Sequence, residues 1–66
     1  MENSLSEHRK ARGLSQQGLA EALGVSRQTV ISLEKGRYDP SLPLAFRLAK
    51  VFDCNIEDLF TPEDDD

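Results

Sequence analysis

The most constraining feature of this 66-residue sequence is Gly24, which stands between two short segments whose apolar residues recur at helical spacing. A glycine at this place can adopt the left-handed conformation that ends a helix. Ser26, two residues later, is a preferred N-cap for a following helix, and Ser15 has the same position before the first segment. The sequence therefore predicts two helices, residues 16–23 and 27–35, joined by a tight turn.

Three further helices are expected around this pair. The first covers about residues 3–12 and ends at Gly13, the fourth follows the cap residue Ser41, and the last follows Asn55. No strand is expected. The predicted fold class is therefore all-α, with five helices and one small hydrophobic core.

Length and residue usage exclude several kinds of site. A chain of 66 residues has room for one domain and one small core, which is marginally stable without further support. Cys54 is the only cysteine and His8 the only histidine, so neither an intrachain disulfide nor a four-ligand zinc site can form. No catalytic residue, metal or cofactor is expected, and dimerisation is the support that remains.

Nothing in the sequence indicates a membrane or an export route. No apolar run approaches the roughly 20 residues of a membrane span, and no charged and then apolar leader opens the chain. We therefore expect a soluble, cytoplasmic protein without membrane contact.

The negative charge of the chain is concentrated at its C-terminal end. The formal net charge is −4, and residues 63–66 are all acidic, so residues 1–60 carry eight acidic and eight basic side chains. Between Arg9 and Arg37, six basic residues stand against two acidic ones. We therefore expect a domain over residues 1–60 with a locally basic surface, followed by a disordered acidic tail over residues 61–66.

The predicted helix over residues 27–35 has two distinct faces. At about 100° per residue, Val30 and Leu33 lie in one narrow sector, which we expect to be buried. The opposite side carries amide, hydroxyl and cationic groups and one aliphatic side chain, without a carboxylate. The members of this exposed face are Arg27, Gln28, Ile31, Ser32 and Lys35.

These side chains have the groups that recognise DNA bases. Glutamine can bind adenine through N6 and N7, arginine can bind guanine through O6 and N7, and an aliphatic group can contact the thymine methyl. A helix pair joined by a tight turn is the helix-turn-helix motif, whose second helix enters the major groove of double-stranded DNA. We therefore predict base-reading roles for Arg27, Gln28, Ile31 and Ser32. The alternative is an ordinary solvated helix face.

Other polar residues flank this helix and are candidates for contact with the DNA backbone. Gln16 stands in the first turn of the helix over residues 16–23, where its amide and the free backbone N–H groups could hold a phosphate. Four more residues complete the predicted phosphate-binding set: Arg12, Lys35, Arg37 and Tyr38. Each of them taken alone could equally be an ordinary surface residue.

Four stretches of the sequence carry a family resemblance: Leu14-Ser15-Gln16-Gln17-Gly18-Leu19-Ala20, Ser26-Arg27-Gln28-Thr29-Val30, Leu33-Glu34-Lys35-Gly36 and Pro40-Ser41-Leu42. They resemble the phage repressor and Cro-like family, also called the xenobiotic-response-element family, over roughly residues 3–60. Within it, the chain is similar to short stand-alone members that lack an effector domain. The resemblance implies a five-helix repressor-like DNA-binding domain, with the helix-turn-helix in its second and third helices. It also implies a homodimer on a palindromic operator and transcriptional repression, with no small-molecule effector evident.

The family's base-reading positions match Arg27, Gln28 and Ser32, and its backbone-contacting positions match Gln16, Lys35 and Arg37. The motif also implies an ion pair between Arg9 of the first helix and Glu34 of the third, so Arg9 is not expected to contact DNA. Asp53 departs from the pattern, because a glycine often ends the fourth helix there. Aspartate adopts the left-handed conformation less freely than glycine, so we expect a cost in stability.

A dimer contact is expected from the apolar residues around the last two helices, namely Phe52, Ile56, Leu59 and Phe60.

The function that fits best is a sequence-specific DNA-binding regulator. One alternative is a protein-interaction module or a toxin-neutralising partner on the same fold, which the acidic balance of the chain favours. An enzyme fits least, because no nucleophile–base pair, metal cluster or phosphate loop can be assembled from these residues.

Overall fold

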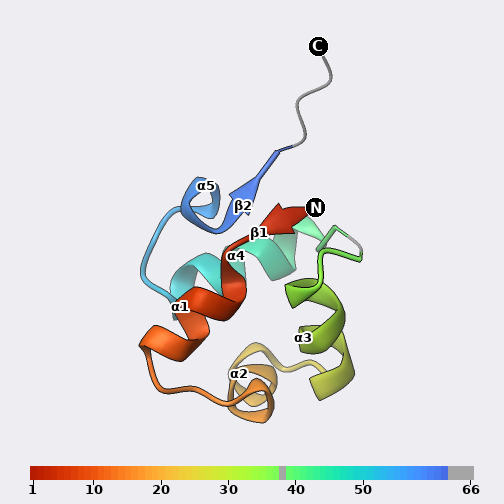
Figure 1. Cartoon of the computed structure of the whole chain (residues 1–66), viewed down its shortest axis with the longest axis vertical. Helices are drawn as coiled ribbons and strands as arrows, with labels where there is room; N and C mark the ends of the chain where they lie inside the picture. The colour runs from red at the N-terminus through yellow and green to blue at the C-terminus, as the bar shows by residue number, and fades with distance from the viewer. Residues whose placement is uncertain (38, 63–66) are drawn as a thin grey trace.

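The computed structural model describes residues 1–37 and 39–62 of the chain. Its elements in chain order are β1 (Glu2–Asn3), α1 (Leu5–Ala11), α2 (Gln16–Leu23), α3 (Arg27–Glu34), α4 (Leu42–Val51), α5 (Ile56–Leu59) and β2 (Phe60–Thr61) (Figure 1). The five predicted helices are therefore confirmed, each close to its expected bounds. Within the described ranges, no helix is long and apolar enough to cross a membrane.

Serine side chains start three of the helices, as predicted. Ser15, Ser26 and Ser41 each accept a hydrogen bond at Oγ from the backbone N–H three residues on, at 2.9, 3.1 and 3.3 Å. Each bond satisfies an N–H group that the first turn of a helix leaves free. At the other end of α2, Gly24 has a φ of 75°, which reverses the chain towards α3. The local chemistry of the sequence thus defines the turn between α2 and α3.

The expectation of no strand is wrong for the two ends of the described chain. β1 and β2 pair antiparallel, with Glu2 opposite Thr61 and Asn3 opposite Phe60. Strands of two residues are too short to show an alternating pattern, and their partners lie far apart in the sequence. Thr61, expected in the acidic tail, is therefore paired in the fold, whereas residues 63–66 lie outside the described part of the chain.

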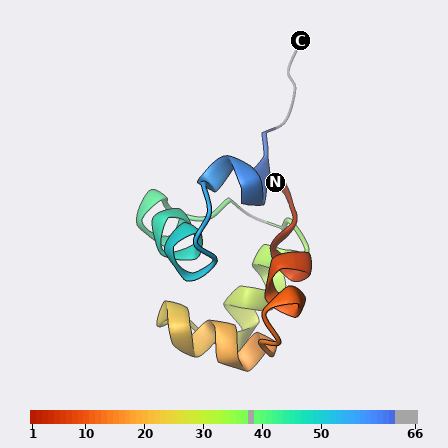
Figure 2. The ribbon, with the colours of Figure 1, turned by 90° about the vertical axis from the view of Figure 1, so that its left-hand side faces the viewer.

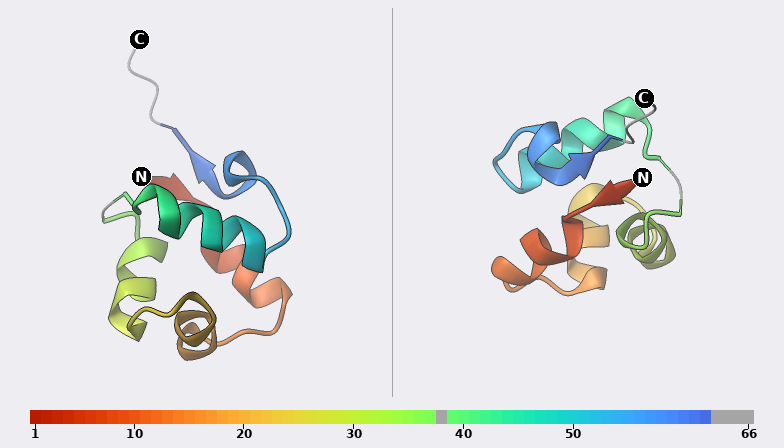
Figure 3. Two further views of the ribbon diagram at one scale, coloured as in Figure 1. Left: turned by 180° about the vertical axis from the view of Figure 1, so that it is seen from behind. Right: turned by 45° about the horizontal axis from the view of Figure 1, so that its top comes forward.

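One hydrophobic core lies between the five helices. Figure 2 shows α2 at one end of the molecule and α5 towards the other. Figure 3 shows α4 running from the loop after α3 to the turn before α5. Every helix contributes to the core, whose buried members are Leu5, Leu19, Ala20, Leu23, Val30, Leu33, Leu44, Ala45, Leu48, Phe52, Leu59 and Phe60.

Most of the residues expected at a dimer contact belong to this core. Phe52 and Leu59 are each 1% exposed, so they cannot contact a second chain without opening their own fold, whereas Phe60, 6% exposed, still lines a surface groove. That part of the expectation is corrected: of the four, only Ile56 is half-buried. Among the described residues, the large apolar side chains that stay exposed are Leu42 and Phe46 of α4, at 64% and 59%.

The end of α4 carries a strained residue. Asp53 has a φ of 51°, the left-handed conformation in which a non-glycine residue costs roughly 1–2 kcal/mol, and less for aspartate. An Asp53→Gly variant is therefore expected to raise the free energy of unfolding by up to about 1 kcal/mol in urea denaturation. Asp53→Ala is the control and should lower it. A glycine variant less stable than the wild type would contradict this explanation.

Candidate nucleic-acid interface

α3 is held against the core by the two residues predicted to anchor it. Val30 is 1% exposed and Leu33 is 2% exposed, and both belong to the hydrophobic core. At the start of the helix, Ser26 Oγ accepts from the backbone N–H of Thr29 and also lies 2.9 Å from its hydroxyl oxygen. The inner face and the first turn of α3 are thus fixed, and the face opposite Val30 and Leu33 therefore points away from the core.

The opposite side of α3 faces outward, as its sequence pattern predicts. Arg27, Gln28 and Lys35 are exposed, whereas Ile31 and Ser32 are half-buried. Gln28 Nε2 lies 3.5 Å from Ser32 Oγ, which is the outer limit of a hydrogen bond and leaves the amide free to turn towards a ligand. This face therefore offers donors, acceptors and an aliphatic contact on one rigid helix.

A nearly buried ion pair keeps the carboxylate of α3 away from that face. Arg9 Nε donates to Glu34 Oε2 at 2.6 Å and Arg9 Nη2 donates to Glu34 Oε1 at 3.3 Å, with side chains 11% and 8% exposed. Arg9 Nη1 also donates to the Leu14 carbonyl at 2.9 Å. The ion pair that the resemblance implies between α1 and α3 is therefore confirmed.

Gln16, a predicted phosphate contact, is joined to the same carboxylate. Its Nε2 donates to Glu34 Oε1 at 3.2 Å, and its side chain is half-buried at the first position of α2. Because Glu34 also holds Arg9, one carboxylate fixes the relative positions of α1, α2 and α3. Gln16 thus stands in the first turn of α2, where backbone N–H groups are free of partners within the helix, and its amide is bonded to Glu34.

The predicted phosphate contacts after α3 are also at the surface. Lys35 and Arg37 are both exposed. The backbone N–H of Arg37 donates to the Ser32 carbonyl at 3.1 Å, so the chain leaves the helix in a closed turn. Tyr38, the last member of the predicted set, lies outside the described residues.

Arg12 has a partner within the chain. Its Nη2 donates to the carbonyl oxygen of Phe52, and its guanidinium carbon lies 5.8 Å from the centre of the Phe52 ring. Phe52 is the C-cap of α4, where free carbonyl groups attract a cation. This contact gives Arg12 a structural role, and its predicted contact with a DNA phosphate stays a prediction.

Two residues that position the helix pair were not predicted from the sequence. Arg47 of α4 donates through Nη1 to the carbonyl of Leu23, the last residue of α2, at 3.4 Å. Asn3 donates through Nδ2 to the carbonyl of Leu33, in the last turn of α3, at 2.8 Å. Both bonds join segments more than 20 residues apart, and no local pattern in the sequence marks them.

The sequence matches a known family along most of its length. A sequence model of the helix-turn-helix family matches residues 5–59. The chain is 56% identical over 66 residues to an uncharacterized HTH-type transcriptional regulator of Methanocaldococcus jannaschii, with 100% of both chains covered. It is also 46% identical over 65 residues to the uncharacterized HTH-type transcriptional regulator YgzD of Bacillus subtilis, with 98% of each covered.

Solved structures share both the fold and part of the sequence. The restriction-modification controller protein C.AhdI from Aeromonas hydrophila is 39% identical with a TM-score of 0.76, covering 85% of each chain. The N-terminal DNA-binding domain of SinR from Bacillus subtilis is 28% identical with a TM-score of 0.72, covering 80% of this chain and 78% of that one. The protein therefore belongs to the helix-turn-helix family of phage repressor and Cro-like proteins, and it is a DNA-binding transcriptional regulator.

Proposed function

We propose that the protein recognises a specific DNA sequence by placing the outward face of α3 in the major groove. The observation that carries this proposal is that the face is exposed and free of carboxylates while its helix is anchored through Val30 and Leu33. A fixed helix can present hydrogen-bonding groups to base edges with little loss of conformational entropy. The residues proposed to read bases are Arg27, Gln28, Ile31 and Ser32.

Contacts with the DNA backbone would fix the register of this helix in the groove. Gln16, at the start of α2, and Lys35 and Arg37, after the reading face, lie around α3 and are the proposed contacts. Tyr38 stays a prediction from the sequence. Contacts of this kind position the protein without reading sequence, and the cationic ones release counterions from the phosphates.

An Arg37→Ala variant is expected to weaken binding by a similar factor on every DNA sequence and to reduce the salt slope of the affinity by about one unit. Fluorescence anisotropy over a series of salt concentrations would measure both quantities. Lys50→Ala is the matched control, because Lys50 is an exposed cation on α4 and its replacement removes the same charge. If both variants weaken binding equally, overall charge rather than Arg37 is responsible. If the wild type shows no salt-dependent affinity, the alternative of a protein-interaction module or toxin-neutralising partner is favoured.

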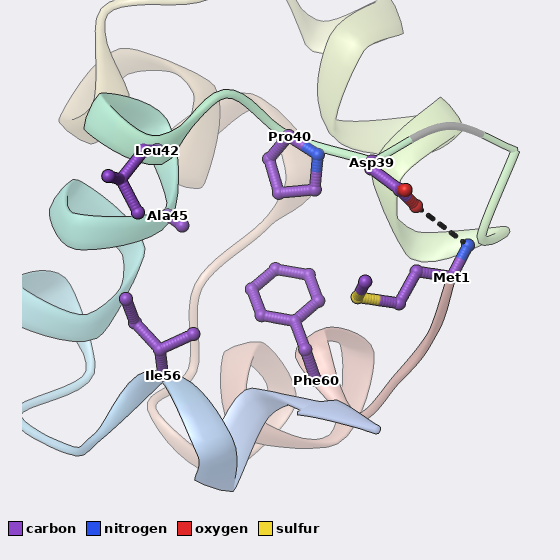
Figure 4. Close-up of a pocket in the computed structure, with 7 residues that line it drawn as sticks. All are labelled: Met1, Asp39, Pro40, Leu42, Ala45, Ile56 and Phe60. Atoms are coloured by element: carbon purple, nitrogen blue, oxygen red, sulfur yellow. Dashed lines mark ion pairs between the residues drawn. The ribbon is translucent and has the colours of Figure 1, made fainter. Parts of the chain in front are cut away.

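We further propose that the protein binds a palindromic operator as a homodimer and represses transcription by occupying it. An apolar groove lies between the loop after α3, α4 and the α5–β2 segment, lined by Met1, Asp39, Pro40, Leu42, Ala45, Ile56 and Phe60 (Figure 4). Leu42 and Phe46 are exposed on the same helix, one turn apart. A two-fold contact that covers this surface would bury these apolar groups, and the reading helices of such a dimer should meet half-sites about 34 Å apart.

A Phe46→Ser variant is expected to shift the protein from dimer to monomer in sedimentation velocity at micromolar concentration. The side chain is 59% exposed, so its loss should leave the fold of one chain intact. Glu7→Ser, at an exposed position of α1, is the control for a neutral surface change. A wild-type protein that stays monomeric at high micromolar concentration would contradict the proposed homodimer.

A further inference from the structure

Asn3 joins three parts of the chain through its side-chain amide. Its Nδ2 donates to the Leu33 carbonyl at 2.8 Å and to the Met1 carbonyl at 3.1 Å, and its Oδ1 accepts from the backbone N–H of Leu5 at 3.1 Å. Leu33 lies in the last turn of the reading helix, and Leu5 is the first residue of α1. The half-buried amide is therefore held by both hydrogens and by its oxygen.

The backbone of Asn3 and Ser4 is hydrogen-bonded to the last two elements of the described chain, α5 and β2. Asn3 pairs with Phe60 of β2, and the backbone N–H of Ser4 donates to the Leu59 carbonyl at 2.8 Å. Ser4 Oγ donates to the Asp58 carbonyl at 3.0 Å, which adds a second bond to α5. The segment of residues 2–4 is thus fastened to α5 and β2 on one side and to the end of α3 on the other.

The space around Gly36 shows how closely this segment packs on the end of α3. Gly36 has a φ of 70°, and a Cβ placed there would lie 2.9 Å from the carbonyl oxygen of Met1. Only a residue without a Cβ lets the Met1 carbonyl lie this close to the end of α3. The Asn3–Leu33 bond is therefore part of a close and specific packing between two segments.

We propose that Asn3 is a positioning residue, which sets the direction of α3 relative to the α5–β2 segment and thereby the half-site spacing that a dimer accepts. The inference rests on the proposed function, because Ile56 and Phe60 line the groove assigned to the dimer contact. In a dimer joined through that groove, any rotation of α3 against α5 changes the distance between the two reading helices. The bond from Asn3 to Leu33 opposes that rotation.

Asn3→Asp tests the bond with little change in shape. The carboxylate keeps an acceptor for the Leu5 N–H at the start of α1, where a negative charge is favourable, but it has no hydrogen to donate to Leu33. Ser4→Ala is the matched control. It removes a hydrogen bond that the same segment makes through Ser4 Oγ to the Asp58 carbonyl, and it leaves the bond to α3 in place. Thermal unfolding of both variants gives their stability for comparison.

Hydrogen exchange on the protein without DNA forms the first arm. Asn3→Asp removes the Nδ2 bonds to both the Met1 and the Leu33 carbonyls, and the loss of the bond to Leu33 should speed exchange of the amides that close α3, those of Gly36 and Arg37, by about fivefold relative to α2. Ser4→Ala should leave that ratio unchanged. If Asn3→Asp leaves the ratio unchanged, or if Ser4→Ala changes it equally, Asn3 does not position α3 and the proposal is overturned.

The second arm measures affinity for operators whose half-site spacing is changed by one base pair in either direction. The wild type should prefer one spacing, and Asn3→Asp should reduce that preference by about fivefold. A loss of affinity that is the same at every spacing would show a role in stability alone and overturn the inference. If the wild type binds no operator specifically, the proposed function fails, and the spacing claim with it. If the wild type discriminates spacing and Asn3→Asp does so equally, only the inference fails.

Discussion

A Glu34→Ala variant is expected to lose about 3–5 kcal/mol of folding free energy, the usual cost of leaving one member of a buried ion pair without its partner. In the wild type, the Glu34 carboxylate accepts from Arg9 at 2.6 and 3.3 Å and from Gln16 at 3.2 Å, and the Arg9 side chain is 11% exposed. A chain of 66 residues has a total stability of roughly 3–10 kcal/mol. The variant should therefore unfold at a much lower urea concentration than the wild type, as circular dichroism would show.

Two further variants separate the ion pair from a general effect of charge. Glu21→Ala removes an exposed glutamate from α2 and should change stability little. Joint replacement of both partners, Arg9→Met with Glu34→Leu, should recover much of the loss because no charge is then left buried. A Glu34→Ala protein within about 1 kcal/mol of the wild type would contradict the account, since that is the contribution of an exposed pair.

A Gln28→Ala variant is expected to reduce discrimination at a single base pair of each half-site by about 1–3 kcal/mol, the usual value of a bidentate contact between a side chain and a base. Its effect on folding should be small, because the side chain is exposed and its only hydrogen bond among the described residues is the 3.5 Å contact with Ser32. Competition binding against operators that carry each single base change would measure the position and size of the effect.

The matched control for this experiment is Gln17→Ala. Gln17 is also an exposed glutamine, but it lies on α2 and donates to Glu21 at 3.2 Å. Its removal should leave the preference at every base pair unchanged, even if overall affinity falls. A Gln28→Ala protein that loses affinity equally on all sequences would place Gln28 among the backbone contacts and contradict its assignment as a base reader.

The parts of the fold predicted correctly from the sequence depend on local chemistry. The serine caps and the left-handed Gly24 act within a few residues, so each can be identified from its neighbours alone. The burial of Val30 and Leu33 follows from their spacing on one helix. The orientation of the candidate reading face could be predicted for the same reason.

The parts that could not be predicted depend on contacts between distant segments. The β1–β2 pair and the bond from Asn3 to Leu33 exist only once the chain has folded. Phe52 and Leu59 could have covered either the chain's own core or a second copy, because apolar residues at helical spacing are equally suited to both. Arg12 likewise shows its partner, the Phe52 carbonyl, only in three dimensions.

The proposed function requires the outward face of α3 to select a DNA sequence. Selection of bound oligonucleotides from a random pool, with the wild type and Gln28→Ala in parallel, is the experiment that decides this. The wild type should enrich one motif with two-fold related halves, and the variant should enrich the same motif with one position relaxed in each half. A wild type that enriches no motif, or a variant that enriches an unchanged one, would contradict the proposed function.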